Sequence, residues 1–119
     1  MSEPMLLAVA SKEGQAISDH FGHAKHFRIY EVSPESCRHV ESRDVAHYCH
    51  GNTGSQNAMA MILETIKDCR AVFVAKIGDG PTEKLAKIGV SAVSSYAWED
   101  IEPSLLDYAR RTAAGEVVA

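Results

Sequence analysis

The sequence lacks an excess of basic charge, a long hydrophobic run and an even set of cysteines. Its 12 lysine and arginine residues are outnumbered by 16 acidic ones, giving a net charge of −4, which argues against a general nucleic-acid-binding protein. No apolar run approaches the roughly 20 residues that cross a bilayer. An odd cysteine count, 3, favours reduced thiols over a disulfide framework, so we expect a cytoplasmic protein.

Internal repeats, low-complexity tracts and obvious linkers are also absent. At 119 residues, with 45% hydrophobic and 24% charged side chains, the chain has the composition of an ordinary globular protein. This length buries one core but not two, so we expect a single domain over residues 1–119. Residues 1–4 lack the basic region of a secretory signal, and the apolar stretch 5–10 is too short for its hydrophobic region.

Hydrophobic periodicity predicts elements in the order β-β-β-α-β-α-β-α. Strands are expected at 5–10, 27–32, 37–45, 71–75 and 90–94, and helices at 55–67, 82–87 and from 102 or 103 to 113. Right-handed crossovers and short hairpins favour a mixed five-stranded sheet of order 3-2-1-4-5, with strand 2 antiparallel and helices on both faces. We thus predict an α/β fold with the three-layer α/β/α ribonuclease H-like motif. Tyr96 and Trp98 are expected to pack the last helix onto the sheet.

The histidines are crowded into one part of the sequence. All 6 lie between His20 and His50, together with Cys37 and Cys49. Imidazole and thiolate are the main protein ligands for zinc, copper and iron–sulfur clusters. This crowding predicts a metal or metallocluster site.

The predicted topology brings three loops to the carboxyl end of the parallel strands, where open α/β sheets bind ligands: 11–26, 46–54 and 76–81. Neighbouring strands are ~4.8 Å apart, so these loops span on the order of 15 Å. A polynuclear cluster would contact several of them more easily than a single ion would. Cys37 and Cys69 are expected at the far end of the sheet, as structural residues.

Within the first loop, histidines recur every third residue around Gly22. His20 and His23 are the better ligand candidates, because His26 begins the second predicted strand. The alternative is that they are exposed or capping loop histidines, some of them influenced by Asp19.

The second loop contains the adjacent pair Cys49 and His50, a thiol and an imidazole able to supply soft ligation. One such pair has no metal-specific spacing, and the alternative is a buried cysteine beside a solvated histidine. In the third loop, Lys76 could pair with an anionic ligand and Gly78 could open backbone N–H groups to it. The alternative is a solvated lysine and an ordinary turn glycine.

Residues 17–32, which begin Ile-Ser-Asp-His-Phe-Gly-His-Ala-Lys-His-Phe, closely resemble the opening motif of the dinitrogenase iron–molybdenum cofactor-binding family. That family includes NifX, NafY and the C-terminal domain of NifB, and segments 45–52 and 71–78 look like the NifB domain in particular. The resemblance implies the same fold and a role in binding or carrying the nitrogenase cofactor, or its iron–sulfur precursor, during assembly. The sequence has no radical-SAM CxxxCxxC motif, so we expect a free-standing relative without the catalytic half of NifB.

The predicted site combines the loops with this resemblance, which places His20, Phe21, Gly22, His23 and Phe27 in the family motif. The predicted cofactor-binding residues are His20, Phe21, Gly22, His23, Lys25, His26, Lys76 and Gly78. The predicted metal ligands are His20, His23, Cys49 and His50. Arg28 is a further candidate cation.

The leading hypothesis is a non-catalytic binding or carrier protein for the iron–molybdenum cofactor or an iron–sulfur precursor. Its expected partners are nitrogenase assembly proteins or apo-dinitrogenase, with no nucleic acid and no membrane, and the chain would be a monomer or homodimer. One alternative is a zinc-binding or interaction module. The other is a metal-dependent nuclease, which is disfavoured because strand 5–10 carries no carboxylate and Asp79 alone cannot hold two magnesium ions.

Overall fold

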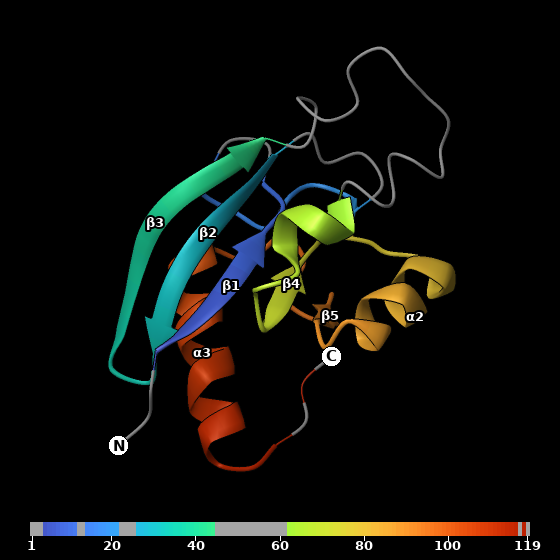
Figure 1. Cartoon of the computed structure of the whole chain (residues 1–119). Coiled ribbons are helices and arrows are strands. Elements are labelled where there is room, and N and C mark those ends of the chain that lie inside the picture. Colours follow the sequence, from blue (N-terminus) through green and yellow to red (C-terminus); the bar gives the residue numbers. More distant parts are fainter. Residues whose placement is uncertain (1–3, 12–13, 22–25, 45–61, 117, 119) are drawn as a thin grey trace.

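The computed structural model describes residues 4–11, 14–21, 26–44, 62–116 and 118 (Figure 1). The strands are β1 (Met5–Val9), β2 (His26–Ser33), β3 (Ser36–Asp44), β4 (Ala71–Phe73) and β5 (Ser91–Val93). The named helices are α2 (Asp79–Lys87) and α3 (Ile101–Ala113), and residues 62–66 are also helical. No helix in these described ranges is both long and apolar enough to cross a membrane.

The sheet has the predicted order, β3-β2-β1-β4-β5. β1 pairs antiparallel with β2, whereas β4 pairs parallel with both β1 and β5. Since β2 and β3 are also antiparallel, β2 is the one strand that runs against the other four. The predicted ribonuclease H-like arrangement is therefore confirmed.

Alternating side chains of the central strands build two cores, one on each face of the sheet. Ala8 packs on the face covered by helix 62–66 and α2, while Leu7 and Val9 pack on the face covered by α3 (Figure 1). All three are completely buried. This alternation explains why β1 reads as a continuous apolar run, because a strand covered on both faces needs apolar side chains in both directions.

The helix after β4 begins earlier than the sequence predicts. α2 starts at Asp79, so residues 79–81 belong to the helix and not to a glycine-rich connection. Pro81 does not prevent this, since proline is tolerated in the first turn, where its missing N–H would have no helical partner. The predicted end is confirmed: Gly89, with φ +82°, stands just past the last turn, as a left-handed C-terminal residue should. Of the predicted helix 55–67, only 62–67 lies within the described residues.

The loop between β5 and α3 contains the clearest error in the sequence prediction. Tyr96 packs as expected, with its ring 5.8 Å from that of Phe73. Trp98 does not: the residue is 63% exposed and its φ is +70°. The apolar face of α3 is instead completed by Ile101 and Tyr108, both in the core.

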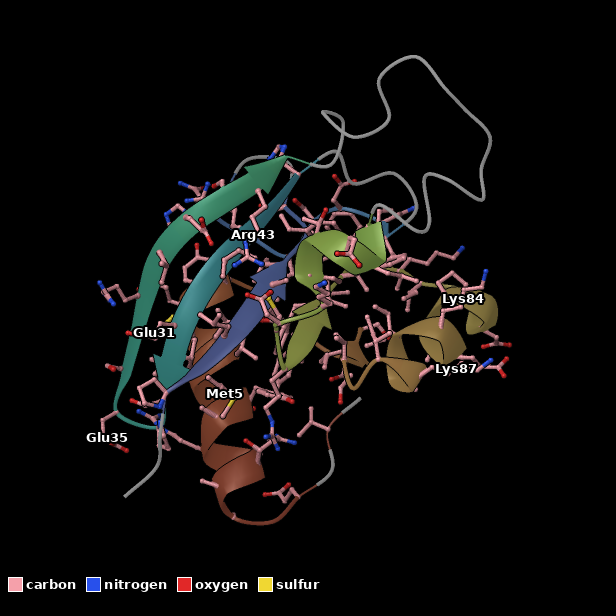
Figure 2. All side chains as sticks on the ribbon, viewed as in Figure 1. Met5, Glu31, Glu35, Arg43, Lys84 and Lys87 are labelled. Carbon is pink, nitrogen blue, oxygen red and sulfur yellow. The ribbon has the colours of Figure 1, made fainter. Side chains whose placement is uncertain are left out.

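One ion-pair network links the edge of the sheet to the segment that leads into β4. Arg43 projects from β3 toward the end of helix 62–66, as Figure 2 shows, and contacts Glu41, Asp68 and the backbone of Thr65. The edge strand β3 is thereby joined to residues 65–68 as well as to β2.

Candidate functional site at the carboxyl rim

The chain that leaves β1 lies along the carboxyl end of the parallel strands and pairs with the chain that leaves β4. The amide of Ala75 donates to the carbonyl of Asp19 (2.9 Å), and the amide of Phe21 donates to the carbonyl of Lys76 (2.9 Å). These bonds form a parallel bridge between His20 and Lys76. The predicted meeting of the first and third loops at one rim is therefore found in the structure.

His20 occupies the centre of this pairing. Its amide donates to Oδ1 of Asp19 (3.0 Å), and its side chain is half-buried. Lys76, its partner across the bridge, is exposed. Paired strands lie about 4.8 Å apart, so the backbones of His20 and Lys76 lie side by side at the rim.

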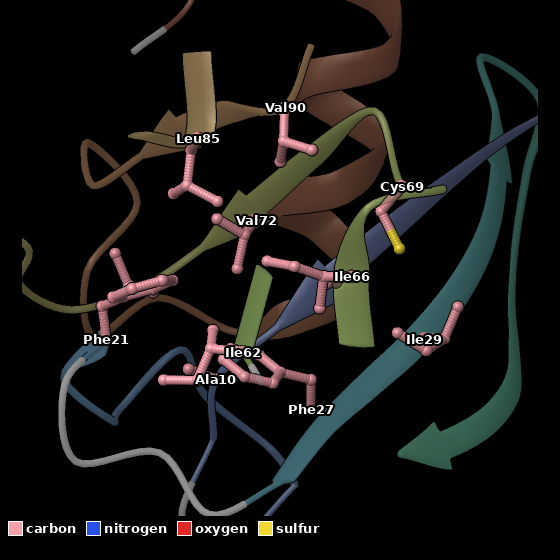
Figure 3. Close-up of a cluster of buried hydrophobic side chains, with 12 residues drawn as sticks. Ala10, Phe21, Phe27, Ile29, Ile62, Ile66, Cys69, Val72, Leu85 and Val90 are labelled. Carbon is pink, nitrogen blue, oxygen red and sulfur yellow. The ribbon is translucent and has the colours of Figure 1, made fainter. Parts of the chain in front are cut away.

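The residues on either side of His20 are anchored in opposite cores. Ile17 is completely buried against the α3 side of the sheet, whereas Phe21 packs on the other side with Ile62 and Leu85 (Figure 3). Burial of a phenylalanine ring contributes on the order of 2 kcal/mol. The chain thus crosses the rim from one face to the other between residues 17 and 21, and His20 is carried by a well-supported backbone.

Two further predicted site residues lie at the same end of the sheet. His26 is exposed at the start of β2, where it pairs with Asp44 at the end of β3. Gly78 is exposed and directly precedes α2, whose first amides receive no side-chain cap. A helix N-terminus of this kind favours an anion, although Asp79 adds a negative charge to the first turn.

The other predicted residues, Gly22, His23, Lys25, Cys49 and His50, lie outside the described residues. Within the described ranges, no three histidine, cysteine, aspartate or glutamate side chains are gathered closely enough to hold a metal ion. His20 is the one predicted metal ligand that the structure describes.

Arg28 is directed toward the α3 face. Its Nε donates to the hydroxyl of Tyr30 (3.3 Å), and its guanidinium covers Gly14, where an added Cβ would lie 3.2 Å from Nη1. Gly14 also has φ +86°, which favours glycine. The geometry gives Arg28 a part in packing the loop after β1.

The two described cysteines lie far from the rim, as predicted. Cys37 pairs with Val32, which in turn pairs with Met5 at the start of β1, and Cys69 precedes β4. Burial raises the pKa of Cys37 to about 11, with a smaller contribution from Glu102. Burial likewise raises the pKa of Cys69 to about 12, followed by the charge of Asp68. Thiols held in their neutral form are poor metal ligands, because the thiolate is the ligating species.

The sequence predicted that His20 and Lys76 would lie at one rim, but it did not predict which backbone groups hold them there. The support comes from backbone groups of Asp19, Ala75 and Phe21. Backbone hydrogen bonds leave no residue-type signature, so only the predicted strand order pointed to this contact.

Comparisons with known proteins agree with this architecture. Residues 3–111 match the family described as dinitrogenase iron-molybdenum cofactor. The chain is 41% identical over 117 residues to the FeMo cofactor biosynthesis protein NifB of Herbaspirillum seropedicae, covering 95% of this chain and 22% of that protein. It is 42% identical over 106 residues to NifB of Bradyrhizobium diazoefficiens, covering 89% of this chain and 21% of that protein. The chain thus spans about a fifth of the length of these relatives.

A solved structure shares the fold. The apo form of the orange protein from Desulfovibrio gigas superposes with a TM-score of 0.61 at 14% identity, covering 100% of this chain and 96% of that one. At this identity the likeness concerns the fold alone.

Proposed function

Because the chain belongs to the dinitrogenase iron-molybdenum cofactor family, we propose that it binds an iron–sulfur metallocluster at its carboxyl rim and carries it without catalysing its conversion. The cargo would be the iron–molybdenum cofactor or its precursor, consistent with relatives named as FeMo cofactor biosynthesis proteins. The observation that carries the proposal is the bridge between His20 and Lys76.

The two residues supply complementary chemistry to an anionic cluster. The imidazole of His20 is a ligand for iron and related metals, and the exposed ammonium of Lys76 offsets negative charge beside it. The amides at the start of α2, next to Gly78, add partial positive charge at the same end of the sheet. Groups spread over one end of the sheet in this way suit a polynuclear cluster better than a single ion.

A carrier must release its cargo, and the described geometry suits release. His20 is only half-buried, and Lys76 and His26 are exposed. We propose that His23, Cys49 and His50 complete the ligand set, on the sequence grounds given above. Few and accessible ligands allow transfer to an acceptor, which by family resemblance would be a nitrogenase assembly protein or apo-dinitrogenase.

The nuclease alternative receives no support from β1. Two-metal hydrolysis needs acidic side chains to hold the ions, but β1 ends in Ala8 and Val9 and is followed by Ala10, and all three are completely buried. The family name describes a cofactor and not a hydrolytic activity.

Anaerobic cluster titration of the purified chain tests the proposal. We expect broad visible absorption and bound iron for the wild type, and roughly tenfold or greater loss of affinity for His20→Ala, in the range seen when metal-site groups are removed. Lys76→Gln should weaken binding less and reduce its dependence on salt. The matched control is His39→Ala, an exposed histidine within β3.

Two outcomes would count against the proposal. Equal cluster affinity for His20→Ala and His39→Ala would show that His20 at the rim is not a cluster ligand. Uptake of zinc without visible absorption would favour the zinc-binding alternative. Single substitution of His23, Cys49 and His50 under the same conditions tests the remaining ligands, with Cys69→Ala as the control for Cys49→Ala.

A further inference from the structure

Trp98 breaks two ordinary rules of protein structure at once. It is the single tryptophan of the chain, yet the residue is 63% exposed. It is also the one non-glycine residue with positive φ among the described residues, at +70°. The left-handed conformation costs a side-chain-bearing residue roughly 1–2 kcal/mol.

The surrounding backbone holds Trp98 in this conformation. Its amide donates to the carbonyl of Ile17 (2.9 Å), and the amide of Ile17 donates to the carbonyl of Glu99 (3.0 Å). Glycine would fill the position without strain. A bulky aromatic side chain that is strained and still faces solvent contributes little to packing, and such outliers point to function.

The surface around Trp98 is acidic. Glu99, Asp100 and Glu102 are all exposed, and none forms an ion pair within the described part of the chain. The sequence has no lysine or arginine between Lys87 and Arg110. Arg28, whose guanidinium covers Gly14 beside Asp100 and Glu102, forms no ion pair with them among the described residues. The N-terminus of α3 favours Asp100 and Glu102, but it does not account for Glu99 or for the exposed indole.

Two hollows flank Pro103 on this surface, and both are lined by carboxylates. Asp100 and Glu102 line a hollow of about 470 Å³. Glu99 lines a second hollow of about 320 Å³, together with Asp107, which already pairs with Arg111. Each hollow has room for more than one water molecule, and Asp100, Glu102 and Glu99 give the two hollows a negative lining that favours a cationic side chain.

We infer that Trp98, Glu99, Asp100 and Glu102 form a docking surface for a protein partner that presents an apolar side chain flanked by lysine or arginine. Exposed tryptophans are typical energetic centres of protein interfaces. The carboxylates supply charge complementarity, which steers the partner and fixes its register.

The docking surface lies beside the rim but does not depend on the cluster. The amide of Trp98 bonds to Ile17, and His20 follows Ile17 by three positions, a span of at most roughly 11 Å. A partner bound here would adjoin the proposed cluster site. The inference nevertheless stands on the exposed tryptophan and the unpaired carboxylates, and its test uses the chain without cargo.

The test measures binding of two dye-labelled synthetic peptides to the whole chain by fluorescence anisotropy. One peptide carries leucines flanked by lysine and arginine, and the other has these cations replaced by glutamate and aspartate. We expect the basic peptide to bind, to shift the emission of Trp98, and to lose affinity as salt is raised. The acidic peptide should not bind.

Matched variants separate a specific surface from general charge attraction. Trp98→Ser should lower the affinity for the basic peptide about tenfold or more. Val40→Ser, which removes another exposed apolar side chain, should leave this affinity unchanged. Glu99→Gln should lower the affinity for the basic peptide more than Glu83→Gln, a substitution on α2, does. Trp98→Gly serves as a second variant that relieves the backbone strain, so its loss of binding cannot be attributed to misfolding.

Three outcomes would overturn the inference. These are equal affinity for Trp98→Ser and Val40→Ser, equal affinity for Glu99→Gln and Glu83→Gln, and no binding of the basic peptide by the wild type. Sedimentation velocity adds a fourth: a concentration-dependent dimer of the wild type that Trp98→Ser abolishes would make a second copy of the chain the occupant. None of these outcomes bears on cluster uptake at His20.

Discussion

Arg43 and Asp68 form a two-point ion pair between the edge strand and the segment that leads into β4. Nη1 of Arg43 donates to Oδ1 of Asp68 at 2.6 Å, and Nη2 donates to Oδ2 at 3.1 Å. Nη1 also donates to the carbonyl of Thr65 at 2.8 Å. The hydrogen bond to Asp68 is the main cause that raises the pKa of Arg43, and the same bond lowers the pKa of Asp68.

Replacing Arg43 by lysine should destabilise the fold by about 1 kcal/mol, because a lysine cannot make the forked contact with Asp68 while also bonding to Thr65. The side chain of Arg43 is only 22% exposed. Urea unfolding followed by circular dichroism measures the change. The control is Arg38→Lys, whose 69% exposed side chain pairs with Glu31 and whose substitution should change stability by less than about 0.5 kcal/mol. Equal effects of the two substitutions would show that the Arg43 network adds nothing beyond a surface pair.

The Arg43–Asp68 pair should also make stability depend on pH. Since the pKa of Asp68 is lowered in the folded state, its contribution is present above its ordinary pKa and is lost as pH falls through the lowered value. The stability difference between wild type and Asp68→Asn should therefore be constant at neutral pH and shrink below about pH 4. Asp68 is 51% exposed, so we expect a difference below about 1 kcal/mol. A difference that grows on acidification would contradict this sign.

At position 98, glycine should give a more stable protein than alanine. Both substitutions remove the indole, but only glycine accepts φ +70° without strain. We expect Trp98→Gly to exceed Trp98→Ala by about 1 kcal/mol in unfolding free energy. Equal stability would mean that the loop relaxes out of the left-handed region when the indole is removed.

Two glycines at opposite ends of α2 should respond to alanine with opposite signs. Gly80 lies in the first turn, and an added Cβ there meets no atom within 4 Å, so Gly80→Ala should stabilise by about 0.5 kcal/mol. Gly89 also has open space, but its φ of +82° makes Gly89→Ala unfavourable by about 1 kcal/mol. Chemical unfolding of the two variants measures both effects. A destabilised Gly80→Ala would argue that the first turn of α2 needs glycine for another reason.

Cys37 and Cys69 should react slowly with thiol reagents in the native protein. Their pKa values, raised to about 11 and about 12 by burial, leave little thiolate at pH 8. Labelling followed by peptide mass mapping should show both sites modified at rates well below those in denaturant. Rapid native labelling of Cys69 would contradict its buried environment.

The sequence predicted the sheet well because its strands are strongly patterned. The wholly apolar run 71–75 indicates a strand covered on both faces, and β4 occupies that central position. From this order alone the contact between the chain after β1 and Lys76 could be expected. The start of α2 could not, because glycine and proline at positions 80 and 81 are typical of a turn, yet both are tolerated in a first helical turn.

Trp98 was misassigned for a related reason. Large aromatic residues are normally buried. Nothing in the amino-acid sequence around Trp98 distinguishes an exposed indole from a packed one. The positive φ arises from hydrogen bonds to Ile17, which is distant in sequence. In the same way, the backbone support of His20 depends on long-range pairing that residue types do not encode.

The anchoring of Ile17 and Phe21 in opposite cores has a thermodynamic consequence for ligation. His20 lies in a backbone segment that is anchored on both sides, so the conformational entropy of this backbone is already lost on folding. An incoming cluster would order little more than the ring itself at this position. The first bond to His20 would then form on a preorganised donor.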